Sequence, residues 1–137
     1  MRVIIIGGVA GGMSAATRLR RLDESAEIIV LEKSGHVSYA NCGLPYYVGG
    51  VIENEKDLLL QTPASLHARF RLDVRVCTEV LAINPSKKVV AIKNLITGEI
   101  SEMDYDKLIL SPGASPVVPP IPGIERGMTL RTVEDVE

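Results

Sequence analysis

The feature that most constrains the fold of this chain is a short apolar run that ends in glycines and opens into a helical pattern. Residues 3–6 are continuously apolar, as expected of a buried parallel strand, and four glycines follow within residues 7–12. Residues 11–22 carry an apolar stripe at helical spacing, formed by Ala15, Leu19 and Leu22 with Ala16 beside them. Glu27–Leu31 is a second apolar run. Together these segments predict a βαβ unit with two adjacent parallel strands.

The remainder of the chain predicts further strands and helices. Residues 35–50 predict a loop and a short helix, and residues 62–72 predict a helix that opens with a Thr-Pro pair. Short strands are expected at residues 74–77, 80–83 and 89–93, with turns at residues 84–85 and 97–98. Lys107–Leu110 predicts another buried strand, and residues 115–122, with four prolines, predict an extended linker. The expected fold class is α/β, a parallel sheet with helices plus a small antiparallel β-meander.

Composition excludes several classes of function. A length of 137 residues fits one domain, and 46% hydrophobic and 23% charged residues are ordinary values for a globular protein. The net charge of −2 gives no indication of a nucleic-acid partner. No apolar run approaches the roughly 20 residues of a membrane span. Two distant cysteines and two histidines predict no metal site, and they fit the reducing cytosol better than a disulfide framework.

The glycine-rich loop, residues 7–12, has the features of an anion-binding turn. Backbone N–H groups at the start of a helix point at a bound anion, and the helix dipole adds positive potential there. Gly7 permits a tight turn, and Gly12 lets the helix approach the neighbouring strand closely. Val9 interrupts the strict G-x-G-x-x-G pattern, although further glycines flank it.

An acidic residue supports the same interpretation. Glu32 ends the second predicted strand, twenty-five positions after Gly7. This spacing is near the about 20 positions expected for an acid that binds ribose hydroxyls. The alternative for this constellation is a tight strand-to-helix turn that holds no ligand.

Cys42 is the candidate nucleophile. It follows Asn41, a good N-cap residue, and it precedes Pro45, which the first turn of a helix tolerates. A thiol at the start of a helix favours its thiolate form. The alternative is a buried cysteine that acts as a small hydrophobe, which is the interpretation preferred for Cys77, expected inside an apolar strand thirty-five positions on. Position 47, where a cysteine pair with five-residue spacing would have its second thiol, is Tyr47.

One face of the first predicted helix is polar and basic. Ser14, Arg18 and Arg21 fall at i, i+4 and i+7 and therefore share a face, about 100° from the apolar stripe. Such a face beside a nucleotide loop could hold the phosphates of a large anionic substrate. The alternative is a solvated helix face.

The last residues predict the start of a helix. Thr132 can cap it, and Asp135 stands three places later. A helix that short cannot hold itself, so we expect that the chain was cut from a longer protein. The alternative is a frayed natural C-terminus.

With these motifs, the chain resembles the N-terminal region of coenzyme A-disulfide reductases. More broadly, it resembles the single-cysteine NADH oxidase and peroxidase branch of the pyridine nucleotide-disulfide oxidoreductases. The matching stretches are residues 4–16, 20–23, 31–33, 38–46 and 105–114. The family usually has phenylalanine where this chain has Tyr39, whereas Val9 is common in this subgroup.

The resemblance implies a role for each matched position. The residues implied to bind FAD are Gly7, Ala10, Gly11, Gly12, Glu32 and Lys33, with a second flavin contact from Ser111, Pro112 and Gly113. Those implied to hold the CoA moiety are Ser14, Arg18, Arg21, Ser38 and Asn41. Cys42 is implied to be the redox nucleophile beside the flavin ring.

The implied activity is transfer of electrons from NAD(P)H through FAD to a CoA disulfide, with Cys42 forming a mixed disulfide with CoA. Oxidases and peroxidases of the branch instead cycle the cysteine through sulfenic acid. A stand-alone nucleotide-binding module without catalysis is a further alternative. On this resemblance, residues 1–114 are the first part of a Rossmann-like FAD-binding domain, which is incomplete. Residues 115–137 are then a Pro-rich linker and the start of an NAD(P)H-binding domain. The resemblance also implies that the parent enzyme is a cytoplasmic homodimer and that this fragment alone is inactive.

Overall fold

A computed structural model of the chain describes residues 1–136; Glu137, the last residue of the predicted 115–137 segment, lies outside the described residues. The strands are β1 Arg2–Ile6, β2 Glu27–Leu31, β3 Asp73–Arg75, β4 Thr78–Asn84, β5 Val89–Asn94, β6 Ile100–Asp104 and β7 Lys107–Leu110. The α-helices are α1 Ala10–Leu22, α2 Leu44–Val48 and α3 Pro63–Phe70. Short 3-10 turns lie at Asn41–Gly43, Glu55–Asp57, Ile124–Arg126 and Val133–Asp135. Within the described residues, no helix is long and apolar enough to cross a membrane.

A parallel sheet forms the centre of the molecule. Its strand order is β3-β2-β1-β7, and every neighbouring pair is parallel. Ile4 pairs with Ile29 on one side and with Leu108 on the other, so three chain segments reach the same edge of the sheet in register. The predicted βαβ unit and the α/β fold class are therefore confirmed.

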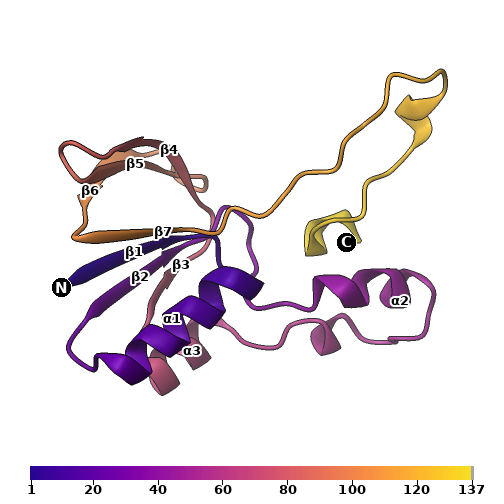
Figure 1. The fold of residues 1–137 in the computed structure, drawn as a ribbon. Helices are drawn as coiled ribbons and strands as arrows, with labels where there is room; N and C mark the ends of the chain where they lie inside the picture. Colours follow the sequence, from indigo (N-terminus) through magenta and orange to yellow (C-terminus); the bar gives the residue numbers. More distant parts are fainter. Residues whose placement is uncertain (137) are drawn as a thin grey trace.

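The sheet is the middle of three layers (Figure 1). Helices α1 and α3 cover one face, where Ile5, Val30 and Leu66 belong to one core cluster. The β-meander covers the other face, where Ile4, Leu31 and Val90 belong to a second cluster. Both faces of the sheet are covered, and the residues of its central strands that lie between the layers are therefore all apolar.

The buried face of α1 differs from the predicted apolar stripe. Met13, Ala16 and Arg20 are buried, whereas Leu22, which was expected in the stripe, is 68% exposed. The stripe prediction was wrong at this end because Arg20, at 8% exposure, occupies the position against the neighbouring helix. Its guanidinium donates to the backbone carbonyl oxygens of Phe70 and Arg71, at the end of α3.

The β-meander is the antiparallel sheet β4-β5-β6. Its predicted turns are confirmed, and Gly98 adopts a φ of +76° in the second one. Cys77 was expected inside a strand, but β3 ends two residues earlier and Cys77 has a φ of +49° in the bend to β4. The chain bends there because β3 and β4 belong to different sheets. Likewise β7 is a strand but not a buried one, since it is an edge strand and Leu110 is 59% exposed.

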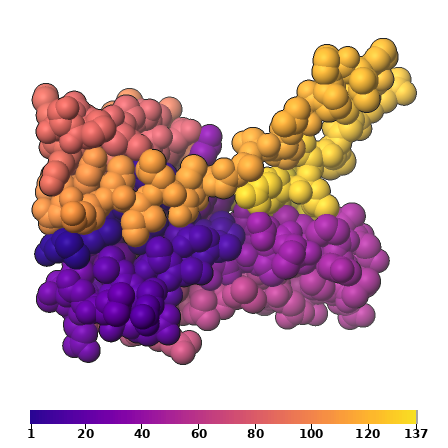
Figure 2. Space-filling model, in the orientation of Figure 1, coloured from indigo at the N-terminus to yellow at the C-terminus, as the bar shows by residue number. Residues whose placement is uncertain are grey.

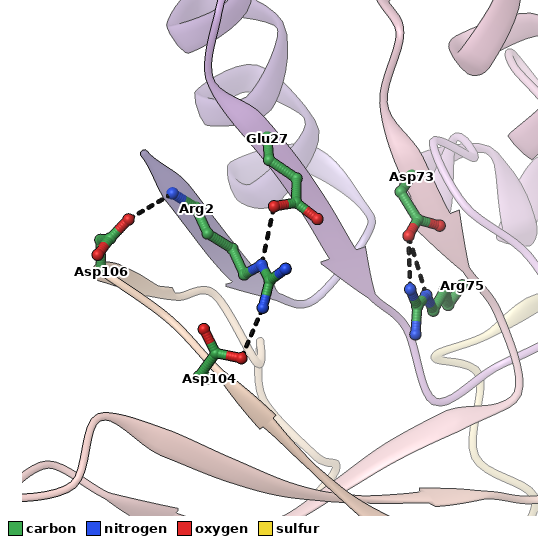
Figure 3. A network of polar contacts seen from close by, with 6 residues as sticks. All are labelled: Arg2, Glu27, Asp73, Arg75, Asp104 and Asp106. Atoms are coloured by element: carbon green, nitrogen blue, oxygen red, sulfur yellow. Dashed lines mark hydrogen bonds and ion pairs between the residues drawn. The ribbon is translucent and has the colours of Figure 1, made fainter.

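A charged network joins the ends of the strands opposite the glycine-rich loop (Figure 3). The Arg2 guanidinium donates to Glu27 on β2 at 2.8 Å and to Asp104 on β6 at 2.6 Å. The Arg2 backbone N–H donates to Asp106 at 2.6 Å. The hydrogen bond to Glu27, and then the negative charges of Asp104 and Glu27, raise the pKa of Arg2. The network fixes the start of β1 between its neighbours.

The predicted caps at Thr62 and Thr132 and the predicted extended backbone after β7 are confirmed. Thr62 caps α3 with a capping box to Ser65, and Thr132 forms the corresponding box with Asp135. Residues 115–122 are exposed and extended, and Figure 1 shows them leaving the body of the protein before the chain turns back.

Candidate functional site

A cavity of about 650 Å³ lies at the edge of the parallel sheet where β1, β2 and β7 end. Its lining includes the glycine-rich loop after β1, Glu32 and Lys33 after β2, and residues 111–115 after β7. The carboxyl ends of parallel strands are where ligands bind in open α/β sheets. The size lies within the usual range of about 300–1,000 Å³ for small-molecule sites.

Two close backbone contacts explain why the loop needs glycine. A Cβ on Gly7 would lie 2.0 Å from the Ser111 carbonyl oxygen, and Gly7 has a φ of +101°. A Cβ on Gly12 would lie 1.8 Å from the Gly7 carbonyl oxygen. The backbone therefore packs directly against backbone where β1 ends, where α1 begins and where the chain leaves β7. This packing leaves the first turn of α1 open toward the cavity.

The Glu32 carboxylate is held by the same loop. One oxygen accepts a 2.7 Å hydrogen bond from the Gly8 N–H, and the other accepts a 2.9 Å bond from the Ser34 N–H. Gly8 itself is buried against Val37 and Glu32, with no room for a Cβ. Glu32 is thus fixed at the cavity wall with lone pairs left for a ligand's hydroxyl groups.

A segment that the sequence did not connect with the site closes another side of the cavity. Arg131, Thr132 and Glu134 line it, after the chain has returned from the extended linker. The Arg131 Nε donates to the Ala114 carbonyl oxygen at 2.9 Å, and the Gly35 N–H donates to Glu134 at 2.9 Å. Figure 2 shows this C-terminal segment, in yellow, seated against earlier parts of the chain. No local sequence signal joins residue 131 to the glycine-rich loop, because the contact depends on how the linker folds back.

Two titratable groups in this wall have shifted pKa values. Burial, and then the negative charge of Glu32, raises the pKa of Tyr39, which remains a neutral phenol. For Glu134, burial acts to raise the pKa. Hydrogen bonds from its own N–H, from Gly35 and from Thr132, together with His36, outweigh burial, and the pKa falls.

Cys42 is exposed and lies in the 3-10 turn directly before α2. The expected Asn41 cap is wrong, because Ala40 precedes the turn and no side chain caps it; α2 is preceded by Gly43. Asn41 instead lines the cavity. Pro45 does stand in the first turn of α2, as expected.

The basic face of α1 is exposed. Ser14, Arg18 and Arg21 all present exposed side chains, and none of them lines the cavity. Arg20, between them in sequence, is turned into the protein instead. The face is therefore accessible to a ligand.

The structure thus separates the predicted site residues into two groups. Those gathered around the cavity are Gly7, Ala10, Gly11, Glu32, Lys33, Asn41, Ser111, Pro112 and Gly113, with Gly12 packed behind Gly7. Those outside its lining are Ser14, Arg18, Arg21, Ser38 and Cys42. Sequence reasoning missed Arg131, Thr132 and Glu134 as cavity residues.

Comparison with known proteins assigns the chain to a family. The family model for pyridine nucleotide-disulphide oxidoreductases matches residues 1–137. The coenzyme A disulfide reductase of Staphylococcus epidermidis is 46% identical over 114 residues, which is 83% of this chain and 26% of that protein. The chain therefore spans about a quarter of the length of the curated relatives that it matches.

Solved structures agree in fold. The crystal structure of reduced Bacillus anthracis CoADR-RHD is 53% identical, with a TM-score of 0.94 over 98% of this chain and 25% of that one. The NAD-dependent persulfide reductase from A. fulgidus is 39% identical, with a TM-score of 0.92 over 99% of this chain and 26% of that one.

Proposed function

The chain belongs to the pyridine nucleotide-disulphide oxidoreductase family, and from this premise we propose that it is the FAD-binding part of an NAD(P)H-dependent coenzyme A-disulfide reductase. The observation that carries the proposal is an exposed Cys42 in the turn that begins with a cavity residue, Asn41. The other cysteine, Cys77, is thirty-five positions away in sequence, so Cys42 has no second thiol next to it in the chain. A relative named coenzyme A disulfide reductase is 46% identical to this chain.

The cavity residues fit the nucleotide half of FAD. The start of α1 offers backbone N–H groups to an anion, and Glu32 has acceptors for ribose hydroxyls. Gly11 and Ser111 both line the cavity, and a Cβ on Gly11 would lie only 3.3 Å from the Ser111 hydroxyl. Lys33 and residues 111–113 complete the proposed cofactor contacts.

Cys42 is proposed to be the nucleophile toward the disulfide. Its thiolate attacks one sulfur of CoA disulfide, which forms Cys42–S–S–CoA and expels the other CoA as a thiolate. Two electrons and a proton then break the mixed disulfide, which releases the second CoA as a thiol and restores the Cys42 thiolate. Bound by the cavity residues, FAD would supply this electron pair from NAD(P)H. The balance is one CoA disulfide, one NAD(P)H and one proton to two CoA thiols and NAD(P)⁺.

The exposed basic face of α1 is proposed to hold the substrate. Arg18 and Arg21 carry positive charge for the phosphates of CoA, and Ser14 adds a hydroxyl donor on the same face. Asn41, next to the nucleophile in sequence, and Ser38, four positions before it, are proposed to hold the part of CoA nearer the sulfur.

The broader context is part of the proposal. We assign residues 1–114 to the FAD-binding domain and residues 115–137 to a linker and the start of an NAD(P)H-binding domain. The parent enzyme is expected to be a cytoplasmic homodimer, and the fragment alone is expected to be inactive. Nucleic acid and membrane are not expected partners.

The test uses the natural full-length protein loaded with FAD. We expect NAD(P)H oxidation to depend on added CoA disulfide and to be lost in Cys42→Ser, because serine cannot form the mixed disulfide. The matched control is Cys77→Ser, which should retain activity, since Cys77 lies outside the cavity lining, in the bend between β3 and β4. Full-rate reduction of CoA disulfide by Cys42→Ser would refute the assigned role.

The alternatives give different outcomes in the same assay. NADH consumption that requires oxygen or peroxide, and not CoA disulfide, would indicate an oxidase or peroxidase that cycles Cys42 through sulfenic acid. A protein that binds ADP but takes up no flavin would indicate a nucleotide-binding module without catalysis.

A further inference from the structure

Tyr39 is a nearly buried aromatic residue whose hydroxyl has no hydrogen-bond partner among the described residues. It is only 6% exposed, yet it is part of the cavity lining. Within residues 1–136, its hydroxyl makes no hydrogen bond to the protein, and no side-chain oxygen or nitrogen is fully buried without a partner. The hydroxyl is therefore open to the cavity, where a ligand can supply the partner that the protein does not.

The backbone holds Tyr39 rigidly in this position. It forms an antiparallel bridge with Leu59, and the Ala40 N–H donates to the Leu58 carbonyl oxygen at 2.8 Å. The Ser38 N–H donates to the Gly8 carbonyl oxygen at 2.9 Å, which ties the segment to the glycine-rich loop. The phenol is therefore presented to the cavity by a fixed backbone, not by a mobile loop.

The charges around the phenol indicate what it can bind. Glu32, Arg131 and Glu134, which all act electrostatically on the phenol, also line the cavity. A raised pKa keeps the hydroxyl protonated, so it donates a hydrogen bond and adds no negative charge to those of Glu32, Glu134 and Asp135. The Arg131 guanidinium and the N–H groups at the start of α1 belong to the same cavity. These donors together suit an anionic oxygen better than a sugar hydroxyl.

We propose that the Tyr39 hydroxyl donates a hydrogen bond to a diphosphate oxygen of the nucleotide held in this cavity. This inference rests on the proposed function, since it requires a nucleotide there. It assigns to the chain a ligand contact that phenylalanine cannot make at the same position.

The test is the Tyr39→Phe variant of the natural full-length protein, stripped of flavin and titrated by calorimetry with ADP and with 2′,3′-dideoxy-ADP. Phenylalanine keeps the buried ring, so the variant should fold. We expect the affinity for each ligand to fall about tenfold, as for a hydrogen bond to a charged group. Equal loss with both ligands identifies the phosphate, because dideoxy-ADP lacks the sugar hydroxyls.

Two results would overturn the inference: ADP affinity within twofold of the wild-type protein, or a loss that disappears with dideoxy-ADP, which would place the contact on the ribose. Tyr105→Phe is the matched control, since Tyr105 is also buried but lies in the core between the two sheets. It should leave both affinities unchanged. If the wild-type protein binds neither ADP nor FAD, the proposed function fails instead, and the two failures are thereby distinguished.

The ligand-free protein gives a second measurement. Removing a hydroxyl that lacks a protein partner should leave the unfolding temperature equal to or above that of the wild-type protein. A marked fall in unfolding temperature without ligand would show that the hydroxyl serves the fold, and would contradict a ligand role.

Discussion

At the scale of single residues, the site depends on where side chains are absent. Gly7 and Gly12 allow backbone atoms of β1, α1 and the β7 exit to come into contact. Gly11 differs from them, because it faces the cavity and a methyl group added there would meet only the Ser111 side chain. The three glycines therefore have different reasons to be glycine, which their similar appearance in the sequence does not reveal.

This difference gives a prediction. Gly12→Ala should destabilise the protein by about 3 kcal/mol or more, because its Cβ would lie 1.8 Å from the rigid Gly7 carbonyl oxygen. Gly11→Ala should change the free energy of unfolding by no more than about 1 kcal/mol, since its Cβ meets a rotatable side chain at 3.3 Å and alanine favours a helix. Chemical denaturation of both variants without flavin measures the difference. Equal destabilisation by the two would contradict the packing argument.

At the scale of elements, a buried arginine joins two helices that the sequence does not connect. The Arg20 guanidinium donates to the carbonyl oxygens of Phe70 and Arg71 at the end of α3, and to those of Asp23 and Glu24 after α1. These carbonyls follow helix ends, where backbone acceptors lack partners within the helix. One side chain thus satisfies both ends and holds α1 and α3 together against the sheet.

Arg20→Met should therefore cost about 3 kcal/mol or more, because four part-buried hydrogen bonds from a buried charged donor are lost. Arg21→Met is the contrasting variant. The Arg21 side chain is exposed, and among the described residues it donates a hydrogen bond only to the Thr17 carbonyl oxygen within α1. The free energy of unfolding of this variant should therefore change by less than about 0.5 kcal/mol. Urea denaturation checks both, and a stable Arg20→Met variant would refute the joining role.

At the scale of the whole molecule, the cavity is closed by parts of the chain that lie far apart in sequence. Residues 131–135 return from the extended linker, bury Val133 and bond to Gly35 through Glu134 (Figure 1). Arg131 of the same segment donates a hydrogen bond to the Ala114 carbonyl oxygen, which follows β7. The lining of the cavity is thus complete only when the segment after the linker returns to the residues that follow β2 and β7.

This closure should depend on pH. The pKa of Glu134 is lowered from its ordinary 4.5, so the carboxylate favours the closed arrangement fully above pH 4.5. That contribution is lost as the pH falls through the lowered value in the folded state. We expect the Gly35 amide to be better protected from hydrogen exchange in the wild-type protein than in Glu134→Gln above pH 4.5, with the difference vanishing in acid.

Comparing two variants at each pH cancels the ordinary pH dependence of exchange and the titration of neighbouring Asp135, whose pKa is also lowered by backbone N–H groups. Glu125→Gln, in the exposed turn at Ile124–Arg126, is the control and should behave like the wild-type protein. A difference at Gly35 that persists unchanged into acid would argue against the carboxylate.

Local sequence patterns are enough to predict the βαβ unit, the β-meander turns and the cavity residues on the glycine-rich loop and at Glu32, whereas residues 111–113 were expected at the site from the family resemblance. These features depend on short-range periodicity, on glycine conformations and on the rule that parallel strands end at one edge. The folded molecule alone reveals that Arg20 is buried, that Cys77 lies in a bend, and that residues 131–134 complete the cavity. Those outcomes depend on packing and chain return between distant segments, which no local pattern encodes.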